Sequence, residues 1–178
     1  MPGPPRPAHL RIRPMASRDL AQVAAIEREA FGREAWPPEV FRDLLRDFAQ
    51  ARPTRGSLWV AEDGATGTVV GYAGVEVSAL RGEADLINIA VAKERRREGV
   101  GEALLARVQA HARRLHVPLL WLRVRASNRG ARRFYSRLGF RERGRFAGYY
   151  EDPDEPAVIM AVEVEGRVYG KTEGRRET

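Results

Sequence analysis

The chain has 178 residues, enough for one domain with a buried core, and it contains no cysteine. The sequence therefore excludes disulfides, thiolate metal sites and a cysteine nucleophile, and it fits a reducing compartment. The net charge of +7 comes almost entirely from arginine, since Lys93 and Lys171 are the only lysines. Such a charge is compatible with an anionic ligand, with a ribosomal or nucleic-acid neighbour, or with solubility alone. Solubility is the default on charge alone, so we expect no direct nucleic-acid binding.

The two ends of the chain lack the pattern of a folded domain. Residues 1–7 are proline-rich without the apolar stretch of a signal peptide, and nowhere do eighteen apolar residues run together. We therefore expect a cytoplasmic protein with no membrane partner. Residues 1–7 predict a disordered leader, residues 8–164 one domain, and residues 165–178 a charged, glycine-rich tail.

The first half of the chain predicts one strand, two helices and two further strands. Leu10 and Ile12 alternate with arginines as a strand, and Ser17 opens a helix that reaches Phe31. A break at 36–38 precedes a second helix over about 39–51 with an apolar face. Strands over 58–61 and 69–77 follow, split by a turn at Asp63 and Gly64.

The segment 87–105 joins an apolar strand to a helix through a turn rich in arginine and glycine. Ile87, Ile89 and Val91 indicate the strand, and a stripe of apolar residues from Val100 to Leu115 indicates the helix. Glycines let a ligand approach the backbone, and a helix start offers free N–H groups to an anion. The turn with Arg96, Gly99 and Gly101 therefore predicts a site for a pyrophosphate.

Two other phosphate motifs do not fit this turn. A Walker loop needs Lys and Ser or Thr after its last glycine, where Glu102 and Ala103 stand. A dinucleotide-binding turn needs a third glycine, where Leu104 stands. An ordinary helix capped by surface arginines stays open as the alternative.

Downstream, an apolar strand over 118–126 leads into a short helix. Asn128 is a suitable N-cap for this helix, and Gly139 can adopt the positive φ of its end. Residues 140–150, an acidic turn over 151–156 and a strand over 157–164 complete the domain.

The turn pattern R-x-x-G-x-G and the later string ASNxxAxxFYxxLGF (126–140) together resemble the GNAT superfamily of N-acetyltransferases. The resemblance implies an α/β fold of the α+β kind: a single-domain mixed, twisted sheet of about seven strands with helices on both faces. Its fourth and fifth strands splay apart, and the pantetheine arm of acetyl-CoA, the cosubstrate, lies between them as an added strand would. The implied cofactor-binding residues are Ile89, Val91, Arg96, Arg97, Gly99, Val100, Gly101, Glu102, Asn128, Arg132 and Tyr135.

Further strings narrow the resemblance to the bacterial ribosomal-protein alanine N-acetyltransferases. These strings are INIAV (87–91), WLRVRASN (121–128), FYSRLGF (134–140), the tyrosine pair 149–150 and the element AFGREAWP (30–37). The resemblance implies that the acceptor is the α-amino group of a protein N-terminus, either of a ribosomal protein or of another protein. A small-molecule amine acetyltransferase and a non-catalytic acyl-CoA-binding or ribosome-interaction module stay open as alternatives.

One position departs from that family. Its general-base glutamate in WLxVRASN is replaced by Arg123, which cannot accept a proton at neutral pH. Asp85 becomes the candidate base, with Glu83 nearby, although exposed carboxylates at a strand edge are common. The resemblance assigns the acid role to Tyr135, and the backbone N–H of Val91 is a suitable oxyanion donor.

The acceptor groove is expected around aromatic residues. Tyr149 and Tyr150, next to the acidic turn, and Phe31 and Trp36 opposite are the candidate substrate-binding residues, together with Arg123. A polar turn between two strands is the alternative for the tyrosine pair. The three histidines at 9, 111 and 116 are scattered, so we expect no metal.

Overall fold

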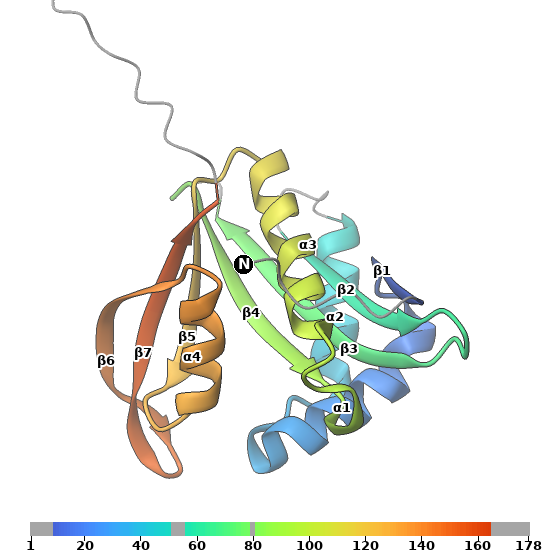
Figure 1. Ribbon diagram of the computed structural model, residues 1–178, viewed down its shortest axis with the longest axis horizontal. Helices are drawn as coiled ribbons and strands as arrows, with labels where there is room; N and C mark the ends of the chain where they lie inside the picture. The colour runs from blue at the N-terminus through green and yellow to red at the C-terminus, as the bar shows by residue number, and fades with distance from the viewer. Residues whose placement is uncertain (1–8, 51–55, 79–80, 165–178) are drawn as a thin grey trace, which may run out of the picture.

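A computed structural model describes residues 9–50, 56–78 and 81–164, and within these ranges the protein has one seven-stranded sheet in the order β1-β2-β3-β4-β5-β7-β6. The expected leader at 1–7 and tail at 165–178 lie outside the described residues, as does residue 51 at the expected end of the second helix. Figure 1 shows the sheet opening between β4 and β5.

The strands form two groups. The first group is an antiparallel meander: β1 (Leu10–Pro14), β2 (Gly56–Asp63), β3 (Val69–Ser78) and β4 (Glu83–Val91). The second group is β5 (Leu119–Arg125), β6 (Arg141–Glu151) and β7 (Asp154–Glu163), with β7 between the other two. The two groups meet at the parallel pair β4 and β5. The expected mixed sheet of about seven strands is confirmed.

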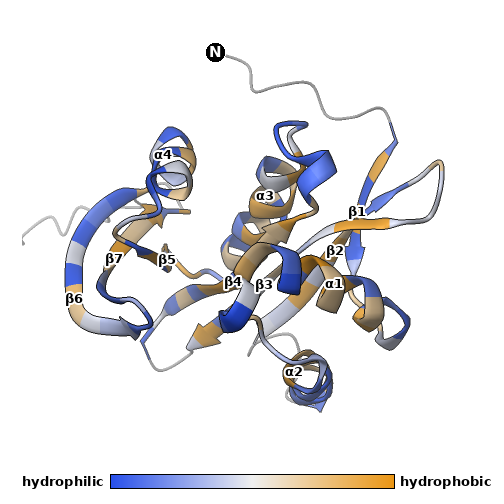
Figure 2. Cartoon of the chain, turned by 90° about the horizontal axis from the view of Figure 1, so that it is seen from below, coloured by the Kyte–Doolittle hydropathy of each residue, from blue (hydrophilic) through white to orange (hydrophobic). Residues whose placement is uncertain are grey.

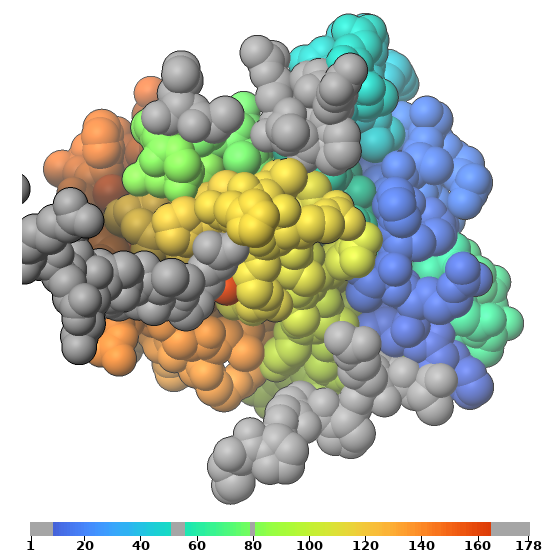
Figure 3. Space-filling model, turned by 90° about the horizontal axis from the view of Figure 1, so that it is seen from above, coloured from blue at the N-terminus to red at the C-terminus, as the bar shows by residue number. Residues whose placement is uncertain are grey.

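Helices cover both faces of this sheet. On one face lie α1 (Leu20–Phe31) and α2 (Pro38–Gln50), and on the other α3 (Val100–Arg114) and α4 (Arg129–Arg137), as Figure 2 shows. Short 3₁₀ turns η1 (Ser17–Asp19), η2 (Gly32–Glu34) and η3 (Lys93–Arg95) join these elements. Figure 3 shows α3 (yellow) lying between the orange C-terminal elements and the blue N-terminal ones.

Two cores fill the layers. The larger lies under α3 and α4 and contains the apolar stripe of α3, with Val100, Leu104 and Val108 almost fully buried. The smaller lies under α1 and α2, around Val23, Phe41 and Tyr72. Each helix thus buries the face that its sequence period predicts.

The splay between β4 and β5 follows from their pairing. They pair only over Glu83, Ala84 and Asp85 of β4, which lie opposite 119–121 of β5. Just beyond, β4 bulges, because Leu86 pairs with Val75 while Asn88 pairs with Gly74, leaving one extra residue. A bulge bends its strand and ends regular pairing, so the carboxyl end of β4 turns away from β5. The expected gap between the fourth and fifth strands is confirmed.

Two local expectations were wrong. Ser17 opens a 3₁₀ turn rather than the α-helix, because the Asp19 carboxylate accepts the N–H of Ala16 (2.8 Å) and holds a separate turn. The acidic turn is shorter than the expected 151–156, since β6 runs to Glu151 and β7 starts at Asp154. Pairing of Tyr150 with Glu155 keeps these residues in the ladder.

Candidate active site

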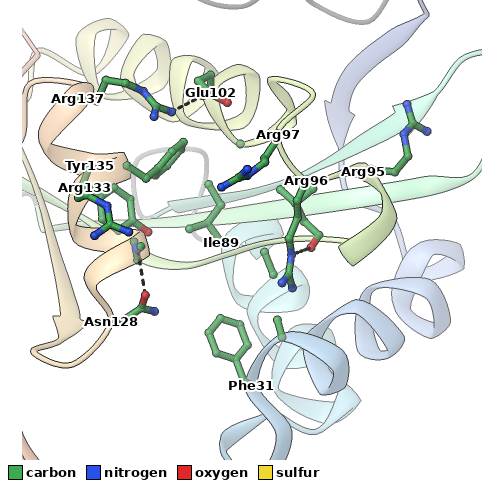
Figure 4. A pocket seen from close by; sticks show the side chains of 17 residues that line it. Phe31, Ile89, Arg95, Arg96, Arg97, Glu102, Asn128, Arg133, Tyr135 and Arg137 are labelled. Atoms are coloured by element: carbon green, nitrogen blue, oxygen red, sulfur yellow. Dashed lines mark hydrogen bonds and ion pairs between the residues drawn. The ribbon is translucent and has the colours of Figure 1, made fainter.

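A pocket of about 570 Å³ opens where β4 and β5 separate, lined by residues of α3 and α4 on one face of the sheet and by Ala30 and Phe31 of α1 on the other. Figure 4 shows Ile89 on its floor, Arg96 and Arg97 on one wall, and Tyr135, Arg133 and Arg137 on the other. The pocket therefore lies between the two motifs that the sequence singles out.

The turn between β4 and α3 forms the cationic wall. Arg95, Arg96 and Arg97 line the pocket there. Gly99 has φ +80° at the N-cap of α3, a conformation that glycine adopts without strain. The N–H of Ala103 bonds Gly99 O (3.0 Å), so the N–H groups before it belong to the open first turn of the helix. Guanidinium groups and a helix N-terminus together suit a phosphate.

The backbone of β4 supplies a donor to the gap. The N–H of Ala92 bonds Val70 O (2.9 Å) on the β3 side, and strand alternation then turns the N–H of Val91 toward β5. Ile89 has the same orientation, but its N–H donates to Asn88 Oδ1 (3.0 Å). The carbonyl of Val91 accepts from Arg96 Nε (3.1 Å), so the end of β4 is held to the cationic turn.

Helix α4 forms the opposite wall. Asn128 caps it as expected, with Oδ1 accepting the N–H of Ala131 (3.0 Å). Tyr135 is 8% exposed and packs edge-on against Phe134 and Phe140. Burial raises the pKa of the Tyr135 hydroxyl above its ordinary value, with a smaller contribution from Tyr150. The hydroxyl is therefore a hydrogen-bond donor at any physiological pH.

Eight of the eleven expected cofactor-binding residues line this pocket, and Gly99, Val100 and Arg132 do not. Val100 is a core residue with 1% exposure, and Gly99 is buried behind the first turn. Arg132 points away from the pocket, where it donates to Ala126 O (3.0 Å) and Glu142 (3.3 Å).

The sequence analysis missed several pocket residues. On α4 they are Arg133, Phe134 and Arg137, and Arg137 donates to Glu102 Oε1 (2.9 Å). Arg133 and Arg137 are four residues apart, so both lie on one side of the helix, and this spacing was the available signal. Arg95 was the other omission from the turn.

Arg125, on β5, joins two segments of the chain near the residues expected to bind the acceptor. Its guanidinium pairs with Glu34 of η2 and with Glu155 of β7 (2.6 Å), and donates to Pro153 O (3.2 Å). It also lies 4.1 Å from the ring centroid of Tyr150. The hydrogen bond from Arg125 lowers the pKa of Glu155. Arg125 thus links the α1–α2 connection to the β6–β7 hairpin.

The aromatic residues expected to bind the acceptor lie on β6, on α1 and between α1 and α2. Tyr149 and Tyr150 stack edge-on 4.9 Å apart on β6. Phe31 is exposed and lines the pocket from α1. Trp36 packs 5.7 Å from Phe41.

The fully buried carboxylate of Glu27 fixes the segment that leads into α2. It accepts the N–H of Trp36 (2.9 Å), the hydroxyl of Tyr72 and the amide of Asn88 (3.2 Å). Asn88 follows the β4 bulge, so this cluster ties the bulge to the groove wall. Burial is the main cause that raises the pKa of Tyr72, with the Glu27 charge adding to it.

Asp85 and Arg123 lie together beside the closed end of the gap. Arg123 Nη1 donates to Asp85 Oδ1 (3.1 Å), and Arg81 lies 3.9 Å from the other oxygen. Neither Asp85 nor Arg123 lines the pocket. Asp85 is thus engaged as an acceptor by the residue that replaces the family glutamate.

Among the described residues, no group of His, Cys, Asp or Glu side chains is arranged to hold a metal ion. Within the same ranges no helix has the length and apolar character needed to cross a membrane.

The known proteins to which this chain is similar are acetyltransferases. A model of the acetyltransferase (GNAT) family matches residues 20–140. An uncharacterized N-acetyltransferase of Methanocaldococcus jannaschii is 39% identical over 150 residues, which cover 84% of this chain and 88% of that protein. An N-alpha-acetyltransferase of Sulfurisphaera tokodaii is 32% identical over 162 residues, which cover 85% and 91%.

A third relative is the ribosomal protein bS18-alanine N-acetyltransferase of Escherichia coli. It is 43% identical over 84 residues, which cover only 46% of this chain and 57% of that protein. The crystal structure of the ribosomal-protein-S18-alanine N-acetyltransferase from Escherichia coli superposes with a TM-score of 0.73 at 29% identity, covering 90% of this chain and 97% of that one.

Proposed function

Because the chain belongs to the acetyltransferase (GNAT) family, whose members use acetyl-CoA, we propose that it acetylates the α-amino group of a protein N-terminus. The proposed acceptor is of the ribosomal-protein alanine type, in the cytoplasm. The observation that carries the proposal is that Val91 and Tyr135 line one pocket from the two sides of the gap between β4 and β5. The similarity to the alanine N-acetyltransferase of Escherichia coli supports the acceptor class.

The pocket offers groups suited to both the pyrophosphate and the pantetheine arm of the proposed cosubstrate. The open first turn of α3 with Arg96 and Arg97 suits the pyrophosphate, and the unpaired edge of β4 suits the amide-bearing pantetheine arm. A Cβ placed on Gly101 would lie 3.2 Å from Phe134 Cζ, so the two walls are close where the phosphates would sit. The pocket thus offers charge at one end and backbone donors at the other.

Two groups stabilise the reaction in this proposal. The amine nitrogen attacks the thioester carbon, and the N–H of Val91 donates to the oxygen that becomes negative. The C–S bond then breaks, and the Tyr135 hydroxyl donates a hydrogen bond to the departing sulfur. A thiol has a pKa of about 8.5, lower than that of a buried tyrosine, so permanent transfer of the tyrosine proton is unfavourable. Tyr135 instead relays to sulfur the proton that the amine loses.

The pairing of the nearby carboxylates with arginines supports an α-amino acceptor. Asp85 is held by Arg123 and Glu102 by Arg137, so these two carboxylates beside the gap are each engaged by an arginine. An α-amino group has a pKa of about 7.7–8.0, against about 10.4 for lysine, so it becomes neutral with far less help. We propose that water carries away the first proton, by which the ammonium form becomes the free amine, with Asp85 as an acceptor once Arg123 shifts. Tyr135 relays to sulfur only the second proton, which the nitrogen loses after it has attacked.

A panel of acceptors tests this proposal. With acetyl-CoA as donor, release of free thiol is measured with alanine-starting peptides, with the same peptides blocked at the N-terminus, with polyamines and with aminoglycosides. The proposal predicts release with the free peptides and a strong loss when the N-terminus is blocked. Faster release with the small amines contradicts the acceptor class, and no release with any amine contradicts catalysis.

A further inference from the structure

The positive charge of the chain is concentrated in one short stretch. Residues 129–145 contain seven arginines and one glutamate, so they account for nearly all of the net charge of +7. Averaged over the whole chain, this charge did not by itself favour a nucleic-acid partner. The distribution of the charge in the fold does favour one.

The structure gathers five of these seven arginines around one concave surface, which we call the α4–β6 surface. Helix α4 and the start of β6 flank a hollow of about 970 Å³ whose lining includes Arg129, Arg132, Arg133, Arg137, Arg141 and Glu142. Figure 2 shows β6 at the outer edge of the sheet, hydrophilic over much of its length, with α4 near its start. The arginines thus face a shared hollow rather than pointing apart.

Within the part of the chain that the structure describes, carboxylates neutralise only part of this charge, and Arg137 pairs with Glu102 of α3 (2.9 Å). Glu142 is the single carboxylate of the stretch, and it holds Arg145 (2.9 Å) and Arg132 (3.3 Å). In residues 9–50, 56–78 and 81–164 no carboxylate pairs with the side chains of Arg129, Arg141 or Arg143. Arg129 and Arg141 therefore line the hollow with open donors, and the exposed Arg143 follows Arg141 on the same strand.

The proposed acetyl-CoA site accounts for only part of the surface. Arg133 and Arg137 also line the pocket between β4 and β5, whereas Arg129 and Arg141 line the separate hollow alone. Charges on an edge strand also prevent sheets from pairing edge to edge, which suits β6. That reason does not extend to Arg129 on α4.

We propose that the α4–β6 surface binds the phosphate backbone of RNA. A row of guanidinium forks matches phosphate oxygens, and arginine rather than lysine is the residue that does this with two parallel hydrogen bonds. The choice of RNA rests on the proposed ribosomal acceptor, whose surroundings are RNA, while phosphate binding rests on the arginines alone. The exposed Phe146 (58%) and Tyr149 (45%) follow on the same strand and offer rings on which unpaired bases stack.

The test measures binding of a short, fluorescent, single-stranded RNA of mixed sequence to the full chain by anisotropy, over a range of salt concentrations. Saturating CoA is present throughout, so that the pocket between β4 and β5 is blocked. The test variant combines Arg129→Gln, Arg141→Gln and Arg143→Gln. The matched control combines Arg18→Gln, Arg28→Gln and Arg42→Gln on the α1 and α2 side, which removes the same charge.

The proposal predicts that the test variant binds RNA at least about tenfold more weakly and that its log–log salt slope falls by about 2, from three lost phosphate contacts. The control should keep the wild-type slope. An equal loss in both variants, or no binding by the wild type at low salt, overturns the proposal. An acidic polypeptide that competes as well as RNA overturns the assignment to RNA.

The binding measurement can fail separately from the proposed function, on which only the choice of RNA rests. Both triple variants should acetylate a free alanine-starting peptide at the wild-type rate, since none of the changed residues lines the pocket between β4 and β5. Absence of acetylation in all three proteins contradicts the proposed function and leaves the RNA result intact.

Discussion

Gly101 gives the sharpest test of the cofactor assignment. A Cβ at this position lies 3.2 Å from Phe134 Cζ, 3.5 Å from Phe134 Cε2 and 3.9 Å from Val91 Cγ2, so it points into the narrow part of the pocket. The two further methyl groups of Gly101→Val must enter the space where a phosphate would approach the first turn of α3. We therefore expect the phosphate to lose one N–H contact.

The magnitude follows from the kind of bond lost. A hydrogen bond to a charged group contributes about 1.5–3 kcal/mol, and about 1.4 kcal/mol corresponds to a factor of ten. Gly101→Val should therefore raise the KM for acetyl-CoA by about 10- to 100-fold, with Gly101→Ala intermediate. The fold should survive, because valine has a better helix propensity than glycine and Phe134 is only half-buried.

Steady-state kinetics with varied acetyl-CoA, together with a thermal melt of each variant, measures this effect. Gly144→Val is the control, since nothing lies within 4 Å of a Cβ at Gly144 and the residue is outside the pocket. A folded Gly101→Val protein with the wild-type KM for acetyl-CoA refutes the assignment of this turn to the cofactor.

The remaining predictions concern chemistry and stability. Tyr135→Phe keeps the ring contacts with its aromatic neighbours and should lower kcat by roughly 100-fold with little change in acetyl-CoA KM or Tm; wild-type turnover would return Tyr135 to a packing role. The rate with an alanine-starting peptide should rise with pH up to the pKa of the amine, about 8. It should not fall again below about pH 10, because burial raises the pKa of Tyr135 and keeps its hydroxyl protonated. A falling limb below that pH argues against the proton relay through Tyr135. Arg123→Glu places a second carboxylate beside Asp85, where two like charges favour sharing a proton. We therefore expect the rising limb of the pH–rate profile to move to lower pH. Loss of acetylation with intact CoA binding would make Arg123 a substrate-binding residue. Tyr72→Phe removes a donor from the buried Glu27 carboxylate and should lower the free energy of unfolding, measured by urea titration, by about 1.5–3 kcal/mol. Tyr149→Phe, at an exposed residue, should change this free energy little. If both substitutions change it equally little, the Glu27 cluster adds no stability.

Local sequence patterns predicted most elements, because alternation and the helical period depend on neighbours along the chain. The stripe from Val100 to Leu115 placed α3, and Asn128 with Gly139 placed the ends of α4. The gap between β4 and β5 came from family resemblance alone. Its physical cause, the bulge between Leu86 and Asn88, depends on pairing with β3 and has no period of its own.

The candidate site was predicted less completely than the fold. The arginines of the turn before α3 are contiguous in sequence, so their charge was visible there. Arg125 was not singled out, because its partners Glu34 and Glu155 lie 91 and 30 residues away, and nothing local indicates which carboxylates the fold brings to it. Arg132 shows the reverse: it stands in the motif string, but the helix turns it toward Glu142 and away from the pocket.

The position of the acetyl group on a single peptide tests the central claim most directly. A peptide that begins with alanine and carries one internal lysine is incubated with the protein and acetyl-CoA, and fragment-ion mass spectrometry locates the product. The account predicts one acetyl group on the alanine α-amino nitrogen, because that amine is neutral near pH 8 and the carboxylates beside the gap are engaged by arginine. Acetylation of the lysine with the N-terminus left free would contradict it.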